Sequence, residues 1–234
     1  MIIHTQFPNI YSFVKYNSHR NTPLPHEIRH QISDFQTYLD TGGQATRSIF
    51  GDALASIWQY GCWCNFDEDL TLGRDQPVDV YDRICRNYQL CLRCARRDGK
   101  VNGEYCDPVG QNYVAENSIG SSSGVGCAVA GSTSCEEHVC LCDQNMLAEL
   151  LELLFSGTGE VPDSSYLHDT YDFEANCAAT TVVYEDVECC GTYPTRYPYS
   201  PSNPNKDCCS DTTVYNPINE ECCADGSAAT IGGC

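Results

Sequence analysis

Apolar residues recur at helical spacing in two long stretches of the chain, residues 78–97 and residues 134–155. In the first stretch they fall on one broad face, which predicts a helix that packs against a core on that side. The residues of this face are Val80, Ile84, Cys85, Tyr88, Cys91, Leu92 and Ala95. In the second stretch they lie on nearly all sides, which indicates a buried helix or a helix that meets a partner. Its apolar residues are Val139, Met146, Leu147, Leu150, Leu151, Leu154 and Phe155.

Two shorter helices are predicted ahead of these. Pro25 suits a first helical turn, and the pair Gly42-Gly43 ends a stretch with one apolar stripe. The stripe consists of Ile28, Ile32, Phe35 and Leu39. Residues 48–59 are predicted to form a second short helix, which leads directly into the sequence YGCWC.

The first 24 residues are aromatic and β-prone but too short to form a domain, and they hold no cysteine. A flexible or surface-laid arm is the simplest interpretation. The alternative is a strand donated to a neighbouring subunit, because several apolar side chains here need burial. The candidate assembly residues are Phe7, Ile10, Tyr11, Phe13 and Val14.

Composition narrows the possible partners. The chain of 234 residues carries 13 Lys and Arg against 32 Asp and Glu, a formal net charge of −19. This excess disfavours nucleic acids and anionic membranes as electrostatic partners. No apolar run approaches the roughly 18 residues of a membrane span, so no span is expected. The N-terminus lacks a signal-peptide pattern, and we therefore expect a mature or trimmed form.

Eighteen cysteines indicate disulfides made in a secretory pathway, because such a density is hard to sustain in a reducing cytosol. The alternative is zinc binding. The paired C-x2-C motifs of a zinc finger are missing at the expected spacing, and the adjacent Cys-Cys doublets suit zinc poorly. We expect an extracellular, secreted, disulfide-rich protein.

One short motif has the form of a zinc-protease helix. His26, Glu27 and His30 match H-E-x-x-H, which places two imidazoles on one helix face with a carboxylate as potential base. Only 25 residues precede it, which leaves no substrate-binding sheet upstream, and the continuation G-x-x-H is absent. We interpret the motif as a solvated helix face and expect neither a metal nor another cofactor.

Residues 60–94 carry a family signal. The sequence YGCWC, a loop and then P-x-D-x-x-D-R-x-C-x-x-Y-Q-x-C resemble the calcium loop and first active-site helix of secreted phospholipase A2. Further along, Cys135, Cys140, Cys142 and Asp143 are similar to the second core helix of that family, C-x4-C-x-C-D. The resemblance implies two core helices stapled together by disulfides.

The resemblance also places three functional positions. The catalytic histidine of the family falls on Tyr88, its calcium-binding aspartate on Gln89, and the aspartate that orients the histidine on Asp143. Tyrosine is not a proton acceptor near neutral pH, and glutamine lacks the charge that calcium favours. Lipolytic activity is therefore not expected, and the protein is predicted not to be an enzyme. Asp143 is interpreted as a relic or a structural hydrogen-bond acceptor.

The loop after Cys64 departs from the family. Asn65 and Asp67 replace glycines of a loop whose backbone carbonyls wrap the calcium ion. Side chains of Asp67, Glu68 and Asp69 could still bind calcium, but their spacing is not that of an EF-hand. A solvated acidic loop is the preferred interpretation.

A set of disulfides is implied by the resemblance, one of which would join the two core helices. The implied pairs are Cys64–Cys85 and Cys91–Cys142, and the pairs Cys106–Cys135 and Cys127–Cys140 fit as well. Another bridge of the family is missing from both ends: Ile84 stands where the family has one cysteine, and its partner position, near Glu149 or Leu150, is also not a cysteine. Cys62 and Cys94 remain, paired either with each other or with the tail.

Residues 156–176 are predicted to be an acidic linker, and residues 177–234 a second module. This module contains three Cys-Cys doublets and resembles the galaxin-type di-cysteine repeats of extracellular matrix proteins. Its proline and tyrosine content favours short strands and turns stapled by bridges. Its eight cysteines would suffice for four internal disulfides if the module is autonomous.

The predicted fold is mainly α and disulfide-rich. An arm of residues 1–24 precedes a phospholipase A2-like helical domain of residues 25–155, and a small disulfide-stapled β or irregular module follows the linker. We expect a non-enzymatic extracellular structural protein whose copies assemble through the arm into a fibre or matrix. Matrix proteins and glycans are further candidate partners. The alternative is a secreted binding module of inactive phospholipase A2 type, which binds a lipid or a protein.

Overall fold

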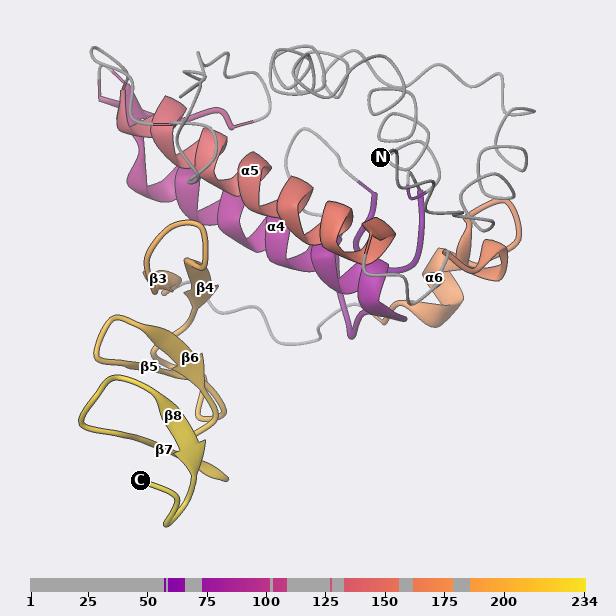
Figure 1. Ribbon diagram of the computed structural model, residues 1–234. Helices are drawn as coiled ribbons and strands as arrows, with labels where there is room; N and C mark the ends of the chain where they lie inside the picture. The colour runs from indigo at the N-terminus through magenta and orange to yellow at the C-terminus, as the bar shows by residue number, and fades with distance from the viewer. Residues whose placement is uncertain are drawn as a thin grey trace, which may run out of the picture.

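The computed structural model describes residues 57, 59–65, 73–101, 103–108, 127, 133–155, 162–178 and 186–234. Two long helices, α4 (Val80–Asp98) and α5 (Ser134–Phe155), run side by side and form its body (Figure 1). The remaining elements are β1 (Lys100–Val101), β2 (Glu104–Tyr105), η1 (Ser164–Tyr166), α6 (Phe173–Asn176), β3 (Glu188–Cys190), β4 (Tyr197–Tyr199), β5 (Asp207–Cys209), β6 (Thr213–Tyr215), β7 (Glu220–Cys222) and β8 (Ala228–Thr230).

Helix α4 begins and ends with residues that suit its termini. The Asp79 carboxylate accepts a hydrogen bond from the backbone N–H of Asp82 at 3.0 Å and so caps the helix. Arg96 and Arg97 lie in the last turn, where positive charge is favourable. The helix covers most of the stretch 78–97 in which the apolar pattern predicted it.

Helix α5 starts at a reciprocal capping arrangement. The Thr133 hydroxyl accepts from the backbone N–H of Glu136 at 3.3 Å, and the Glu136 carboxylate accepts from the backbone N–H of Thr133 at 2.6 Å. The helix spans the whole of the stretch 134–155 named from its apolar residues.

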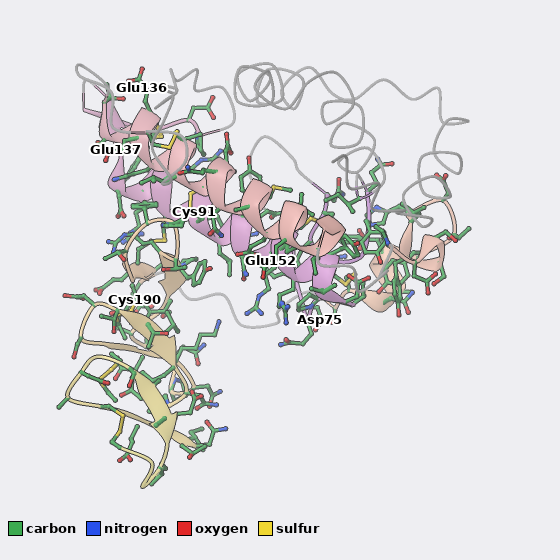
Figure 2. All side chains as sticks on the ribbon, viewed as in Figure 1. Asp75, Cys91, Glu136, Glu137, Glu152 and Cys190 are labelled. Atoms are coloured by element: carbon green, nitrogen blue, oxygen red, sulfur yellow. A yellow bond between two sulfur atoms is a disulfide. The ribbon has the colours of Figure 1, made fainter. Side chains whose placement is uncertain are left out.

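The hydrophobic core lies between these two helices. Cys91 and Cys142 form a disulfide across it with their Cα atoms 5.8 Å apart, and Figure 2 labels Cys91 at this position. Leu92 and Leu150 are each 1% exposed and Val139 is 0% exposed. Burial of side chains of this size contributes about 1.5–3 kcal/mol each, so packing and cross-linking both hold the helices.

Residues 162–178 pack against the start of the body. Tyr60 forms a β-bridge with Leu167, whose side chain is buried. The backbone N–H of Gly61 donates to the carbonyl oxygen of Tyr166 at 2.8 Å. The described part of the segment 156–176, which the sequence predicts to be an acidic linker, thus contributes an apolar residue to the core.

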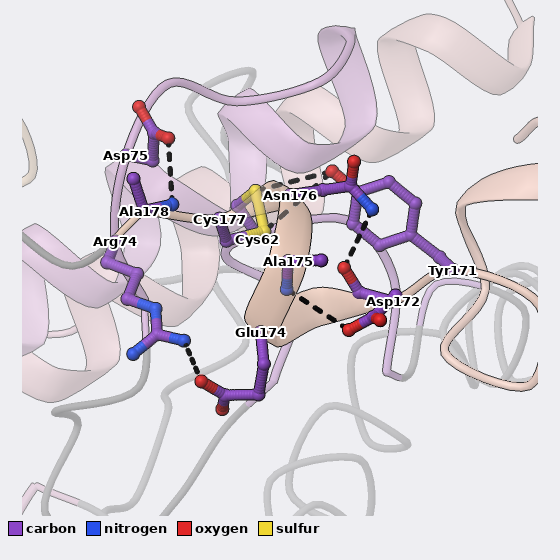
Figure 3. Close-up of polar contacts among 10 residues, drawn as sticks. All are labelled: Cys62, Arg74, Asp75, Tyr171, Asp172, Glu174, Ala175, Asn176, Cys177 and Ala178. Carbon is purple, nitrogen blue, oxygen red and sulfur yellow. Dashed lines mark hydrogen bonds and ion pairs between the residues drawn. A yellow bond between two sulfur atoms is a disulfide. The ribbon is translucent and has the colours of Figure 1, made fainter.

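A disulfide and an ion pair fasten the end of this segment (Figure 3). Cys177, directly after α6, is bonded to Cys62. Arg74 forms an ion pair with Glu174 at 2.5 Å. The short helix α6 is thus cross-linked to the turn that precedes α4.

Three antiparallel hairpins, β3–β4, β5–β6 and β7–β8, form a column that leads away from the helices (Figure 1). Each hairpin is bonded to the next, and the last disulfide closes the final turn. These bonds are Cys190–Cys208, Cys209–Cys222 and Cys223–Cys234. The two cysteines of each doublet therefore bond in opposite directions along the column. The small strands fit a disulfide-stapled module.

The column is joined to the body by covalent and polar contacts. Cys94 of α4 and Cys189 of β3 form a disulfide with their Cα atoms 6.0 Å apart. Asp98, the last residue of α4, forms an ion pair with Arg196 and accepts a hydrogen bond from the Tyr193 hydroxyl at 3.0 Å. The base of the column is thus fixed to the C-terminal end of α4.

The tail does not contain the four internal disulfides that an autonomous module would have. Cys177 pairs with Cys62, and Cys189 pairs with Cys94, so two of the eight tail cysteines bond to the helical body. Of the two pairings left open for Cys62 and Cys94, the structure contains the one with the tail. All eighteen cysteines are used in nine disulfides, and none is free.

Several predictions fall on residues outside the described ranges. They concern the arm 1–24 with Phe7, Ile10, Tyr11, Phe13 and Val14, the helix expected over 25–42, all of the helix expected over 48–59 except residues 57 and 59, the H-E-x-x-H motif, and the loop acids Asp67 and Asp69. The domain boundaries also stay predictions. Within the described ranges, no helix has both the length and the apolar character needed to cross a membrane.

Candidate functional site

Two polar side chains meet between α4 and α5. The Tyr88 hydroxyl donates a hydrogen bond to a carboxylate oxygen of Asp143 at 2.7 Å. Both residues are buried, at 7% and 6% exposure. The Cys91–Cys142 disulfide lies beside the pair and fixes the separation of the two helices. Asp143 therefore acts here as the hydrogen-bond acceptor for a phenol, which compensates part of the cost of burying its carboxylate.

The next residue, Gln89, turns to the other side of α4 and is fully buried. Its amide nitrogen donates to the backbone carbonyl oxygens of Trp63 and Asn65, and the latter distance is 3.1 Å. Both carbonyl groups belong to the chain that follows the YGC turn. A buried amide with two backbone acceptors is well satisfied, and it holds this backbone against the helix.

Arg93, one turn further along α4, holds the other end of the same loop. Its guanidinium donates to the carbonyl oxygen of Gly73 at 3.1 Å and approaches the Gln89 amide oxygen at 3.5 Å. A Cβ atom at Gly73 would lie 2.4 Å from the Trp63 ring and 2.5 Å from that amide oxygen. Only glycine permits this approach. Asn65 and Gly73 are thus each hydrogen-bonded to a side chain of α4.

The resemblance to phospholipase A2 implies a calcium ion at this loop, and the described residues do not fit one. Gln89 presents a neutral amide whose N–H groups point at the carbonyl oxygens that a cation would need. In the described part of the chain, no group of three His, Cys, Asp or Glu side chains could hold a metal ion. Two hydrogen-bond donors, Gln89 and Arg93, contact the loop where the resemblance places the ion.

A second buried carboxylate, Asp82, organises the YGCWC turn. It accepts hydrogen bonds from the backbone N–H groups of Cys62 at 2.9 Å, Trp63 at 2.7 Å and Val78 at 2.9 Å. Burial raises the pKa of this carboxyl, and the three donors oppose that shift. Gly61 has a φ of +57°, and a Cβ atom there would lie 2.5 Å from the carboxylate carbon of Asp82. The turn therefore needs glycine for its conformation and for this close approach.

The structure places the positions singled out from the sequence near the middle of the helix pair. Tyr88 and Asp143 contact each other, while Gln89 lies against the adjacent loop. The four disulfides implied by the resemblance are present, namely Cys64–Cys85, Cys91–Cys142, Cys106–Cys135 and Cys127–Cys140. The roles of Asp82 and Arg93 were not anticipated. The P-x-D-x-x-D motif was the available signal for Asp82, which is its second aspartate. The first aspartate of the motif, Asp79, caps the helix.

Comparison with known proteins agrees with this geometry. Residues 43–153 match the sequence model of the phospholipase A2 family. The human group IIF secretory phospholipase A2 is 27% identical over 99 residues, which cover 42% of this chain and 51% of that protein. Phospholipase A2 A2-actitoxin-Cgg2a of Condylactis gigantea is 29% identical over 87 residues, 37% of this chain and 63% of its own.

A third relative is named as a phospholipase A2 homolog. The neutral phospholipase A2 homolog taipoxin beta chain 2 of Oxyuranus scutellatus scutellatus is 34% identical over 84 residues, 36% of this chain and 58% of its own. This chain thus spans between about half and two thirds of the length of these three curated relatives. The matched residues 43–153 end before the hairpin column begins.

These comparisons correct one prediction. The absence of enzymatic activity was inferred from Tyr88 and Gln89, but the matched family and the relatives are phospholipases A2, an enzyme family. The replacement of two side chains does not by itself establish inactivity. Relatives that include a secretory phospholipase, together with nine disulfides, are consistent with an extracellular location. The helical body, with its paired disulfide-stapled helices, has a phospholipase A2-like fold.

Proposed function

We propose that the protein is an extracellular structural building block whose copies assemble into a fibre or matrix. In this proposal the phospholipase A2-like helices serve as a rigid body, and the hairpin column and the N-terminal arm serve as connectors. The galaxin-like character of the column, which rests on its Cys-Cys doublets, belongs to the same proposal. Matrix proteins and glycans are the further partners it implies.

The observation that carries the proposal is the continuous disulfide path through the molecule. α4 alone contributes Cys85, Cys91 and Cys94, which bond to the YGCWC turn, to α5 and to β3 respectively. From β3 the path continues through every hairpin to Cys234. A body and a projecting column joined in this way keep a fixed relative position, which suits a load-bearing unit more than a mobile two-domain protein.

The arm is the proposed contact between copies. Its residues Phe7, Ile10, Tyr11, Phe13 and Val14 are the basis of a donated strand, and head-to-tail donation gives an open filament rather than a closed ring. Strand donation satisfies backbone hydrogen bonds along an exposed sheet edge, and each short hairpin of the column has such edges.

Assembly can be tested with the full chain and two variants. We expect the full chain to form elongated particles in negative-stain images and to sediment faster as its concentration rises. Deletion of residues 1–24 should leave monomers. A second variant replaces Phe7, Tyr11 and Phe13 by serine and keeps the chain length. It should lose assembly as the deletion does. A full chain that stays monomeric at high concentration contradicts the proposal, and a deletion variant that still polymerises contradicts the role of the arm.

Phospholipid hydrolysis is a second candidate, because the matched family and the relatives favour it. In this chain the buried Tyr88–Asp143 pair lies where the resemblance places the catalytic groups. Release of fatty acid from phospholipid vesicles should be measured with calcium and with a chelator. Loss of hydrolysis in Asp143→Asn, with unchanged circular dichroism, would assign the reaction to this pair.

A further inference from the structure

A cavity of about 540 Å³ lies between the C-terminal half of α4 and the base of the hairpin column. Its size is in the range of small-molecule sites. Cys189, one of the residues that line it, is bonded to Cys94 of α4, so a disulfide fixes the two walls relative to each other. This fixed geometry means that a ligand would not have to order the site on binding.

The cavity has a charge opposite to that of the chain. Of the described residues that line it, four are Arg or Lys and none is Asp or Glu. The sequence as a whole has a formal net charge of −19. Arg96 lies 4.0 Å from Asp107, whose side chain is 71% exposed, and an exposed pair at this distance is weak. Asp98, on the same helix, is already engaged by Arg196.

The cations approach the cavity from both walls. Arg96 and Arg97 belong to the last turn of α4, and Lys206 lies just before β5. The pKa of Lys206 lies below its usual value because nearby protein removes part of its hydration, although the residue keeps an exposed surface, and the charge of Arg86 adds to the shift. An anion in the cavity would be attracted by all three of these side chains.

The other walls are flat and largely apolar. Tyr105, which is 67% exposed, and Pro198 line the cavity together with Tyr199. The Tyr199 hydroxyl donates to Glu188 at 3.1 Å, which limits rotation of that ring. Such surfaces accept the face of a ring with apolar C–H groups, and they leave the polar atoms of that ring free to reach the cations.

We propose that this cavity binds a small anionic ligand, a sulfate or phosphate ester carried on a sugar-sized ring. Arg96, Arg97 and Lys206 contact the ester oxygens, and the tyrosine faces contact the ring. The acidic surface outside the cavity repels long polyanions, which restricts the ligand to a short one. This site is independent of the proposed assembly and of the Tyr88–Asp143 pair.

Calorimetric titration of the full chain tests this proposal, with N-acetylglucosamine 6-sulfate, N-acetylglucosamine 6-phosphate and uncharged N-acetylglucosamine as probes. We expect at least one ester to bind saturably, with an affinity that falls as salt is added. The uncharged sugar should bind at least about tenfold more weakly, because charge-assisted hydrogen bonds are then lost. The tighter of the two esters identifies whether the natural ligand is a sulfate or a phosphate.

Substitutions locate the binding site. Arg97→Gln and Lys206→Gln should each weaken binding by roughly three- to tenfold. Both side chains are exposed, and unchanged circular dichroism will show that the variants fold. Arg83→Gln, an exposed change on α4 outside the cavity, is the matched control and should leave the affinity unchanged.

Three outcomes would overturn the proposal. They are no binding of either ester at millimolar concentration, equal binding of the uncharged sugar, and an equal loss in the Arg83 control. Inorganic sulfate that binds as tightly as the ester would remove the role assigned to the tyrosine faces. A heparin chain that binds tighter than the short ester would contradict the restriction to a small ligand.

Discussion

The helical body and the hairpin column are held together by different means. In the body, Leu92, Val139 and Leu150 are almost fully buried between the helices, in addition to the disulfides. In the column, the buried hydrophobic side chains among the described residues are those of two cysteines, Cys190 and Cys209. The body therefore has a core that its cross-links reinforce, whereas in the column the cross-links replace a core.

This difference follows from the amount of apolar surface that each region can bury. Two paired helices of this length shield a continuous apolar face, but a three-residue strand pair shields almost nothing. Ile218 and Ile231 in the column are 65% and 63% exposed, although they are large apolar residues. Small units of this kind depend on staples for their stability.

The largest expected effect comes from removal of the Cys91–Cys142 disulfide by alanine at both positions. The bond closes a sequence separation of 51 residues, for which chain entropy predicts a loss of about 4 kcal/mol. Because the core remains, the far-ultraviolet circular dichroism of the helices should persist at 25 °C. Urea titration against the unaltered protein measures the loss.

The matched change in the column is removal of Cys209–Cys222, again with alanine at both positions. Its separation of 13 residues predicts a smaller loss, about 3 kcal/mol. The resulting unfolding should nevertheless be confined to the hairpin β7–β8 and be complete there, because this hairpin has no core. Amide hydrogen exchange should show loss of protection over residues 220–230 with little change in α4. Retained protection there would mean that the column has another source of stability.

The same comparison can be made with apolar truncations. Leu150→Ala in the body should cost about 2–5 kcal/mol, because the side chain is 1% exposed and leaves a cavity. Val214→Ala in strand β6, where the residue is only half-buried, should cost less than about 1 kcal/mol. Thermal unfolding of the two variants measures both losses of stability. Similar losses would contradict the distinction between the two regions.

The smallest effect concerns pH at the junction of the two regions. His138 of α5 stacks on Tyr193 with ring centroids 3.9 Å apart, and burial lowers its pKa, while Asp98 and Glu137 oppose the shift and Arg196 adds to it. The folded state therefore binds the proton less readily than the unfolded state. The corresponding stability is fully present above the unfolded pKa of about 6.5 and is lost as the pH falls below it.

His138→Phe provides the control for this titration, since it keeps a ring for the stack and removes the proton site. Between pH 7 and pH 5 the unaltered protein should lose more free energy of unfolding than the variant. Equal losses in both proteins would show that His138 does not carry this pH dependence.

Part of this structure could be predicted from the sequence. Apolar spacing gave the extent of α4 and α5, because each helix buries a face with a regular period. The resemblance supplied four disulfide pairs, but it left the partners of Cys62 and Cys94 open, and spacing alone does not determine that they are Cys177 and Cys189. The burial of Leu167 in the core was not predicted, because one apolar residue in an acidic segment has no periodicity.

The candidate site was predictable in its identities but not in its contacts. Tyr88, Gln89 and Asp143 could be named from motif positions. The hydrogen bonds from Gln89 and Arg93 to the loop depend on how closely Gly73 approaches the helix, and no local pattern reports that distance. The cavity beside Arg97 likewise depends on where the Cys94–Cys189 disulfide places the column.

The alternating pairing of the Cys-Cys doublets has a mechanical consequence. Under tension between Cys94 and Cys234, the shortest covalent route passes through four disulfides and the peptide bonds within three doublets, and it bypasses every hairpin loop. Rupture of the strand hydrogen bonds would therefore release almost no additional chain length. The column should behave as a nearly inextensible tether, whose resistance to pulling is set by sulfur–sulfur bonds and is lost when they are reduced.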